Sequence, residues 1–108
     1  MTQKSLKEMQ KEVDEWISGL ESGYWPALSQ LAQLVEETGE LARELNHLHG
    51  QKIPKNSDER RNIEDEMGDI MFVLACLANS MKIDLSSCLE KSLEKLRHRD
   101  KDRWKKKK

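Results

Sequence analysis

The stretch Ile70-Met-Phe-Val-Leu-Ala-Cys-Leu-Ala78 decides the fold, because it is apolar on every side when wound into a helix. A helix without a polar face has to be buried on all its sides. The stretch is the second half of segment 58–81, whose first half is acidic, and the whole segment is predicted to form one helix. A chain of only 108 residues buries a modest core, so part of this helix is expected to contact another subunit.

Three more helices are predicted around this segment. Ser5 and Glu8 form a capping-box pattern at the start of a helix over 5–19, and Asp84 precedes the last helix. Between them, Pro26 opens a long helix that ends at Gly50. Its predicted buried face carries Leu28, Leu31, Leu34, Val35, Leu41, Leu45 and Leu48. The sequence thus predicts an all-α, four-helix bundle-like subunit whose core is completed by oligomerisation.

Charge and composition restrict the classes of partner. The chain is 36% charged but has a formal net charge of only -1, so it is not a globally basic nucleic-acid binder. We expect one all-α domain over 1–100 and a basic tail over 101–108. The lysine run in that tail could contact RNA electrostatically, but a solvated tail is the simpler interpretation, and no nucleic-acid partner is expected.

The cysteines and the apolar runs predict a cytoplasmic protein. Cys76 and Cys88 do not form a disulfide framework, and they are interpreted as reduced thiols. Residues 1–20 lack the apolar stretch of a signal peptide. The uncharged run 70–81 is shorter than the roughly 20 residues that span a bilayer, so no membrane partner is expected.

Two short acidic motifs, Glu37-Thr-Gly-Glu40 and Glu66-Met-Gly-Asp69, carry the strongest chemical signal. Residues three apart lie on one face of a helix, so two adjacent helices would bring these carboxylates together. Like charges in one site repel each other unless cations are present. Mg²⁺ takes oxygen ligands and commonly joins carboxylates to substrate phosphates. The motif pair therefore predicts magnesium-dependent phosphate chemistry.

An acidic helix face is more often simply solvated, and the glycines argue against that interpretation here. Each motif holds a glycine, Gly39 or Gly68, beside its second acid. Glycine inside a helix costs roughly 1 kcal/mol relative to alanine. Two such glycines suggest that a helix or a phosphate approaches the backbone closely.

These motifs resemble those of the MazG-type nucleotide pyrophosphohydrolases, in the all-α NTP pyrophosphatase superfamily. The similarity rests on Leu34-Val-Glu-Glu-Thr-Gly-Glu-Leu-Ala42, on Asp65-Glu-Met-Gly-Asp-Ile70 and on Ala78-Asn-Ser-Met-Lys-Ile-Asp-Leu85. It extends over about residues 25–99. The resemblance implies hydrolysis of a nucleoside triphosphate to the monophosphate and pyrophosphate, including house-cleaning of non-standard nucleotides. It also implies Mg²⁺, with Mn²⁺ as the alternative ion.

The resemblance also implies roles for individual residues. By motif match the metal ligands would be Glu37, Glu40, Glu66 and Asp69, and Glu36 would support them or act as the base. Lys95 and Arg99 match phosphate-binding positions, although cations are common near a helix C-terminus. Tyr24, Trp25 and His47 match positions that line a nucleobase pocket, whereas Trp16 is expected in the core.

Alternatives remain at this point. A phosphoribosyl-ATP pyrophosphohydrolase-type enzyme would share the fold and the acids. A non-enzymatic helical dimerisation or regulatory module would need neither the acids nor Mg²⁺. A homodimer or a tetramer is expected in either case.

Overall fold

The structure, a computed structural model, describes residues 2–50, 59–105 and 107, and for residues 59–61 the backbone alone. Within these residues the chain forms helices α1 (Leu6–Ser18), α2 (Ala27–His49), α3 (Glu59–Ser80) and α4 (Leu85–Arg99), and no strand. The predicted all-α class is therefore confirmed. Residues 51–58, between α2 and α3, and two lysines of the predicted basic tail, Lys106 and Lys108, lie outside the described residues.

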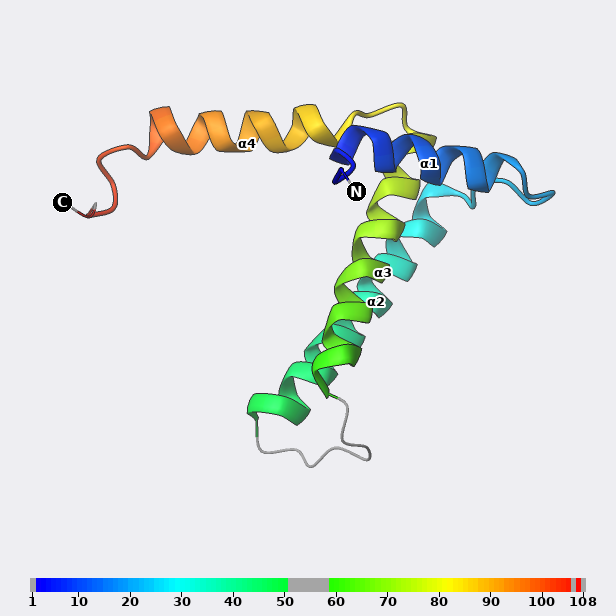
Figure 1. Cartoon of the computed structure of the whole chain (residues 1–108), viewed down its shortest axis with the longest axis horizontal. Coiled ribbons are helices and arrows are strands. Elements are labelled where there is room, and N and C mark those ends of the chain that lie inside the picture. The colour runs from blue at the N-terminus through cyan, green and yellow to red at the C-terminus, as the bar shows by residue number, and fades with distance from the viewer. Residues whose placement is uncertain (1, 51–58, 106, 108) are drawn as a thin grey trace.

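Helices α2 and α3 form a long antiparallel hairpin, and α1 crosses the end of it (Figure 1). Helix α4 packs against α1 and then extends away from the hairpin. The radius of gyration is 17.3 Å. A compact domain of about 100 residues has a radius near 13 Å, so one chain does not close its helices around a single core.

Local capping explains where the helices begin. Ser5 Oγ accepts from the backbone N–H of Glu8 at 3.1 Å, and the Glu8 side chain accepts from the N–H of Ser5. The predicted capping box is thus confirmed. Asp84 caps α4, where its side chain accepts from the N–H of Ser86 at 3.2 Å. Gly50 ends α2 as predicted.

The core within one chain is small. The buried hydrophobic residues are Ile17, Val73, Ala75, Cys76 and Ala78. The predicted buried face of α2 is only partly covered within the chain. Leu34 and Leu41 are half-buried, but Leu28 is 80% exposed and Val35 is 65% exposed. The residues of α2 that are buried are instead the polar Gln30 and Glu44. An apolar stripe indicates that a face avoids water, but it does not indicate which chain covers it.

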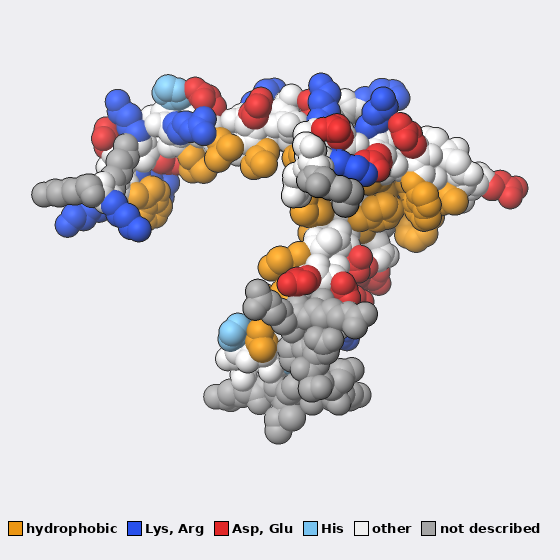
Figure 2. Space-filling view, viewed as in Figure 1, with side chains coloured by type: hydrophobic (Ala, Val, Ile, Leu, Met, Phe, Trp, Pro, Cys, Tyr) orange, Lys and Arg blue, Asp and Glu red, His pale blue; other side chains and the backbone are white. Residues whose placement is uncertain are grey.

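The apolar stripe of helix α4 is also left uncovered by its own chain. Its stripe residues Leu89, Leu93 and Leu96 are all exposed. Figure 2 shows hydrophobic side chains along the side of α4 that is turned toward the hairpin. Among the described residues, no single helix is long and apolar enough to cross a membrane. Helices α3 and α4 reach that length and apolar content only when taken together, and the pair is bent by 105°.

Candidate active site

The two acidic motifs meet on the α2–α3 hairpin. Glu37 and Glu40 come from α2, and Glu66 comes from α3. One carboxylate oxygen from each of these three residues lies within 4.8 Å of the other two. Each residue is half-buried. The i, i+3 spacing on α2 and the antiparallel pairing with α3 together produce this cluster.

The cluster is electrostatically unfavourable as a set of bare carboxylates. Burial, together with the neighbouring acids Glu37 and Glu40, raises the pKa of Glu66 to about 7. Oε2 of Glu37 and Oε2 of Glu66 are buried without a hydrogen-bond partner. The Gln33 amide donates to the other Glu37 oxygen at 2.9 Å, which holds that carboxylate in place. Oxygens that lack donors and repel one another are suited to a hard cation.

The other two predicted acids lie close by in the chain but differ in setting. Asp69 is exposed and lines a pocket together with Glu37. Glu36 is exposed on α2, one helical turn from Glu40 and on the same face. Asp69 is therefore accessible beside the cluster, whereas Glu36 is exposed but does not line the pocket.

A pocket of about 480 Å³ adjoins the acids. This volume lies in the roughly 300–1,000 Å³ range of small-molecule sites. One wall is acidic, from Glu37 and Asp69, and the remainder is mostly apolar and aromatic. The aromatic residues that line it are Trp16, Tyr24, Trp25 and Phe72.

Sequence reasoning missed two of these aromatic residues. Trp16 was expected in the core, yet it is 61% exposed and lines the pocket. Its ring makes an edge contact with Phe72, with centroids 6.0 Å apart and planes at 70°. Trp16 therefore faces an open pocket, which residues of α2 and α3 also line, and not a packed core.

The predicted base-pocket residues separate in the structure. Tyr24 and Trp25 both line the pocket. The Tyr24 hydroxyl donates to Asp14 at 2.6 Å, and partial burial raises the pKa of Tyr24 to about 12. His47 lies two helical turns beyond Glu40, with Nδ1 3.8 Å from a Glu44 oxygen. His47 is therefore not brought into the pocket with the other two.

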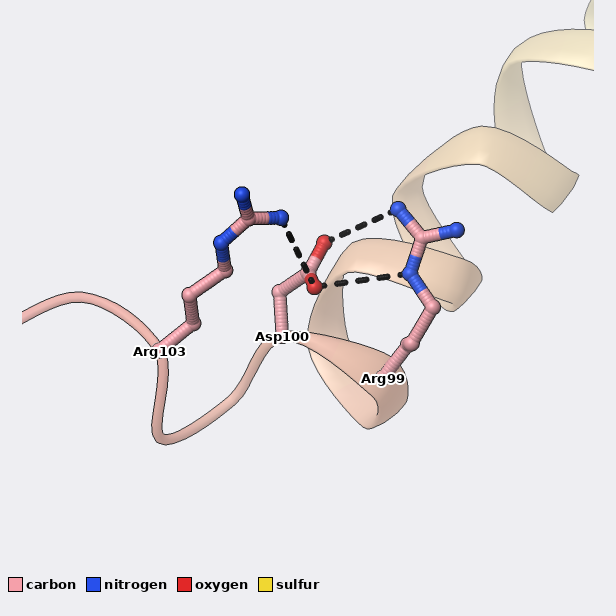
Figure 3. Close-up of polar contacts among 3 residues, drawn as sticks. All are labelled: Arg99, Asp100 and Arg103. Atoms are coloured by element: carbon pink, nitrogen blue, oxygen red, sulfur yellow. Dashed lines mark hydrogen bonds and ion pairs between the residues drawn. The ribbon is translucent and has the colours of Figure 1, made fainter.

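The predicted phosphate-binding cations do not meet the acids within one chain, because α4 extends away from the hairpin (Figure 1). Lys95 and Arg99 both belong to α4. Figure 3 shows Arg99 directed at Asp100, with N–O distances of 3.4 and 3.2 Å. Arg103 approaches the same carboxylate at 3.7 Å. Any contact of Arg99 with a triphosphate would therefore compete with Asp100 or involve another subunit.

Comparisons with known proteins give a consistent result. The family model described as the MazG nucleotide pyrophosphohydrolase domain matches residues 26–104. The chain is 45% identical over 104 residues to YpjD of Bacillus subtilis, a protein named as uncharacterised, with 96% of this chain and 94% of YpjD covered. It is 37% identical over 71 residues to the Gene 37 protein of Mycobacterium phage L5, with 65% and 61% covered.

A solved structure supports the same relationship. The crystal structure of a Bacillus-conserved MazG protein, described as a nucleotide pyrophosphohydrolase, superposes with a TM-score of 0.80 at 45% identity. The match covers 94% of this chain and 99% of that one. With its helical hairpin, its acidic cluster and this match over most of its length, the chain belongs to the MazG nucleotide pyrophosphohydrolase family and is a hydrolase of that type.

Proposed function

We propose that this protein hydrolyses a nucleoside or deoxynucleoside triphosphate to the monophosphate and pyrophosphate, with Mg²⁺ or Mn²⁺ as the required ion. The observation that carries the proposal is the cluster of Glu37, Glu40 and Glu66, whose ligand oxygens lie within 4.8 Å of one another. Family membership makes the chain an enzyme, so the non-enzymatic module is set aside. House-cleaning of non-standard nucleotides is part of the proposal.

The donor set fits a hard divalent cation. Glu37 Oε2 and Glu66 Oε2 have no donor in the described structure, although both are buried. Asp69, on the rim of the pocket beside Glu37, is the proposed fourth ligand. A bound divalent ion neutralises phosphate oxygens and makes a water molecule more acidic.

The chain's own side chains supply the remaining chemistry. Gln33 orients the Glu37 carboxylate through its 2.9 Å hydrogen bond. Glu36, exposed on the same helix, is the proposed base that takes a proton from the attacking water. Trp25 and Tyr24 would hold the base in the pocket, where stacking contributes roughly 1–3 kcal/mol. The role of His47 in binding the base stays a prediction, because this residue lies at the outer end of the hairpin.

The phosphate-binding half of the site is proposed to come from a second subunit. Lys95 and Arg99 lie on a helix whose apolar stripe is exposed in the single chain. If a partner's hairpin covers that stripe, these cations approach the partner's acids, and an Arg can bind phosphate through two hydrogen bonds. A homodimer or a tetramer would satisfy this arrangement. The two free cysteines favour a reducing compartment, and we propose the cytoplasm.

The test is a pyrophosphate-release screen over natural and modified nucleotides, each measured with Mg²⁺, with Mn²⁺ and with a chelator. We expect release of pyrophosphate and a monophosphate only when the divalent ion is present. Undiminished turnover after complete chelation would refute the metal requirement. Release of inorganic phosphate alone would refute the position of cleavage.

A further inference from the structure

Gln30 is the most buried polar residue among those that the structure describes, with 4% of its surface exposed. Its amide nitrogen donates to the Trp25 carbonyl oxygen at 2.6 Å and to Ser80 Oγ at 3.1 Å. A backbone carbonyl can only accept, so the amide end that faces Trp25 has to be the nitrogen. The orientation of the Gln30 side chain is thereby fixed.

The opposite end of this amide is unsatisfied. Gln30 Oε1 is buried and has no hydrogen-bond partner. Gln10 provides a comparison within the same chain, because it is also buried, with 8% exposed. The Gln10 nitrogen donates to Asn79 and to the Ile83 carbonyl, and its oxygen accepts from the N–H of Leu85. Gln10 is thus satisfied at both ends, as a structural amide should be, whereas Gln30 is satisfied at one end only.

Gln30 also lies in the wall of the pocket that adjoins the acids. Its nitrogen is already engaged by the Trp25 carbonyl oxygen and by Ser80. Because Gln30 itself lines the main pocket, the unpaired oxygen is the end of its amide that is left to accept from a ligand there. Trp16 and Trp25, which line that pocket, are 61% and 56% exposed, so both rings are accessible to a flat ligand in it.

We propose that Gln30 Oε1 selects the base of the substrate by accepting a hydrogen bond from an exocyclic amino group. This inference rests on the proposed nucleotide hydrolysis and names the substrate class. Cytosine and adenine present an amino donor where thymine and guanine present a carbonyl acceptor. A carbonyl at that position would set two acceptors against each other and leave Oε1 unpaired. The enzyme is thus specific for nucleotides with an amino group at C4 of a pyrimidine or C6 of a purine.

The first experiment uses the wild-type protein and substrates that differ only at this group. We expect kcat/KM to be at least about tenfold higher for dCTP than for dUTP, and for dATP than for dITP, the worth of one well-placed hydrogen bond. Binding of the monophosphates without metal, followed by quenching of tryptophan fluorescence, should show the same order for dCMP over dUMP. Equal values within both pairs would overturn the inference.

Two variants locate the effect on Gln30. Gln30→Met keeps the length of the side chain but removes the acceptor, and it should bring both ratios close to one. Ser80→Ala removes a partner of the Gln30 nitrogen and leaves Oε1 in place, so its ratios should remain those of the wild type. A Gln30→Met protein that is folded by circular dichroism and retains the wild-type ratios would also overturn the inference.

The outcomes separate this inference from the proposed function. Hydrolysis of nucleotides without an amino preference would contradict only the role of Gln30. Absence of pyrophosphate release with every nucleotide would contradict the proposed function. In that case the comparison of metal-free dCMP and dUMP binding still decides whether the pocket prefers a base with the amino group.

Discussion

The α2–α3 hairpin and helix α4 differ in how much of their packing one chain supplies. The hairpin pairs two segments distant in sequence and gathers Glu37, Glu40 and Glu66 at one place. Helix α4 contacts α1 at its start, but its leucine stripe is exposed. The difference indicates that a single chain forms the acidic cluster, whereas the proposed cationic half of the site depends on what covers α4.

The largest expected effect is on the acidic half. Glu40→Gln and Asp69→Asn should each lower kcat/KM more than about 100-fold, because even groups that only support metal ligands contribute 10–100-fold. The helix content should be unchanged, since neutralising one member of a repelling cluster removes no favourable contact. Steady-state pyrophosphate release and circular dichroism measure both quantities.

Glu21→Gln is the matched control for this prediction, because it makes the same substitution in the exposed connection between α1 and α2. It should behave as the wild type. Wild-type activity in Glu40→Gln would contradict the assignment of the cluster as the metal site.

The second effect concerns assembly. Leu74→Asp on α3 or Leu93→Asp on α4 places a charge on an exposed apolar surface, and each should dissociate a homodimer or tetramer. Light scattering coupled to size exclusion measures the mass. Leu93→Met, which retains an apolar side chain of similar volume, should leave the oligomer intact. A wild-type protein that is a stable monomer at high concentration would show that the stripe has no partner copy.

The sequence predicted the parts of the molecule that local rules determine. The Ser5–Glu8 box, the Asp84 cap and the acidic cluster each follow from spacing along one helix or from pairing of two adjacent helices. The burial of Gln30 could not be predicted in this way. A glutamine on a helix carries no local signal of burial. Its partner Ser80, fifty residues away in the sequence, is recognised only after α2 and α3 have paired.

The exposure of the apolar stripes was also beyond sequence reasoning. Leu28 and Leu31 were placed on a buried face by periodicity, and both are exposed in the single chain. Periodicity reports the preference of a face for an apolar environment and contains no information about the chain that provides it. The same limit applies to Lys95 and Arg99, whose distance from the acids depends on the path of α4.

The third prediction tests whether the site joins two subunits. Arg99→Ala should lower kcat/KM roughly tenfold or more, as expected for a lost hydrogen bond to a charged group, and the metal affinity should change little. Co-expression of Arg99→Ala chains with Glu40→Gln chains should give mixed oligomers in which some sites have both residues intact. Their activity per chain should exceed the mean of the two separate homo-oligomers. If it equals the mean, Arg99 does not act across a subunit boundary.

The smallest effect concerns the glycines beside the acids. Apart from its own helix backbone and chain neighbours, a Cβ added at Gly39 or Gly68 would meet no atom of the described residues within 4 Å. In a dissociated subunit, such as Leu74→Asp if it remains folded, Gly39→Ala should therefore raise stability by about 0.5–1 kcal/mol, a gain of a few degrees in Tm. In the intact oligomer we expect Gly39→Ala to lower stability instead, because a partner helix that packs on these glycines would meet the new methyl group.

Thermal unfolding of Gly39→Ala in both backgrounds decides this point. The exposed Ala42→Gly on the same helix is the reverse control and should lower stability in both backgrounds. A rise in Tm for Gly39→Ala in both backgrounds would mean that nothing approaches this face of the hairpin in the assembly. The glycine would then have no packing role, and the partner that covers α4 would have to approach the hairpin from another side.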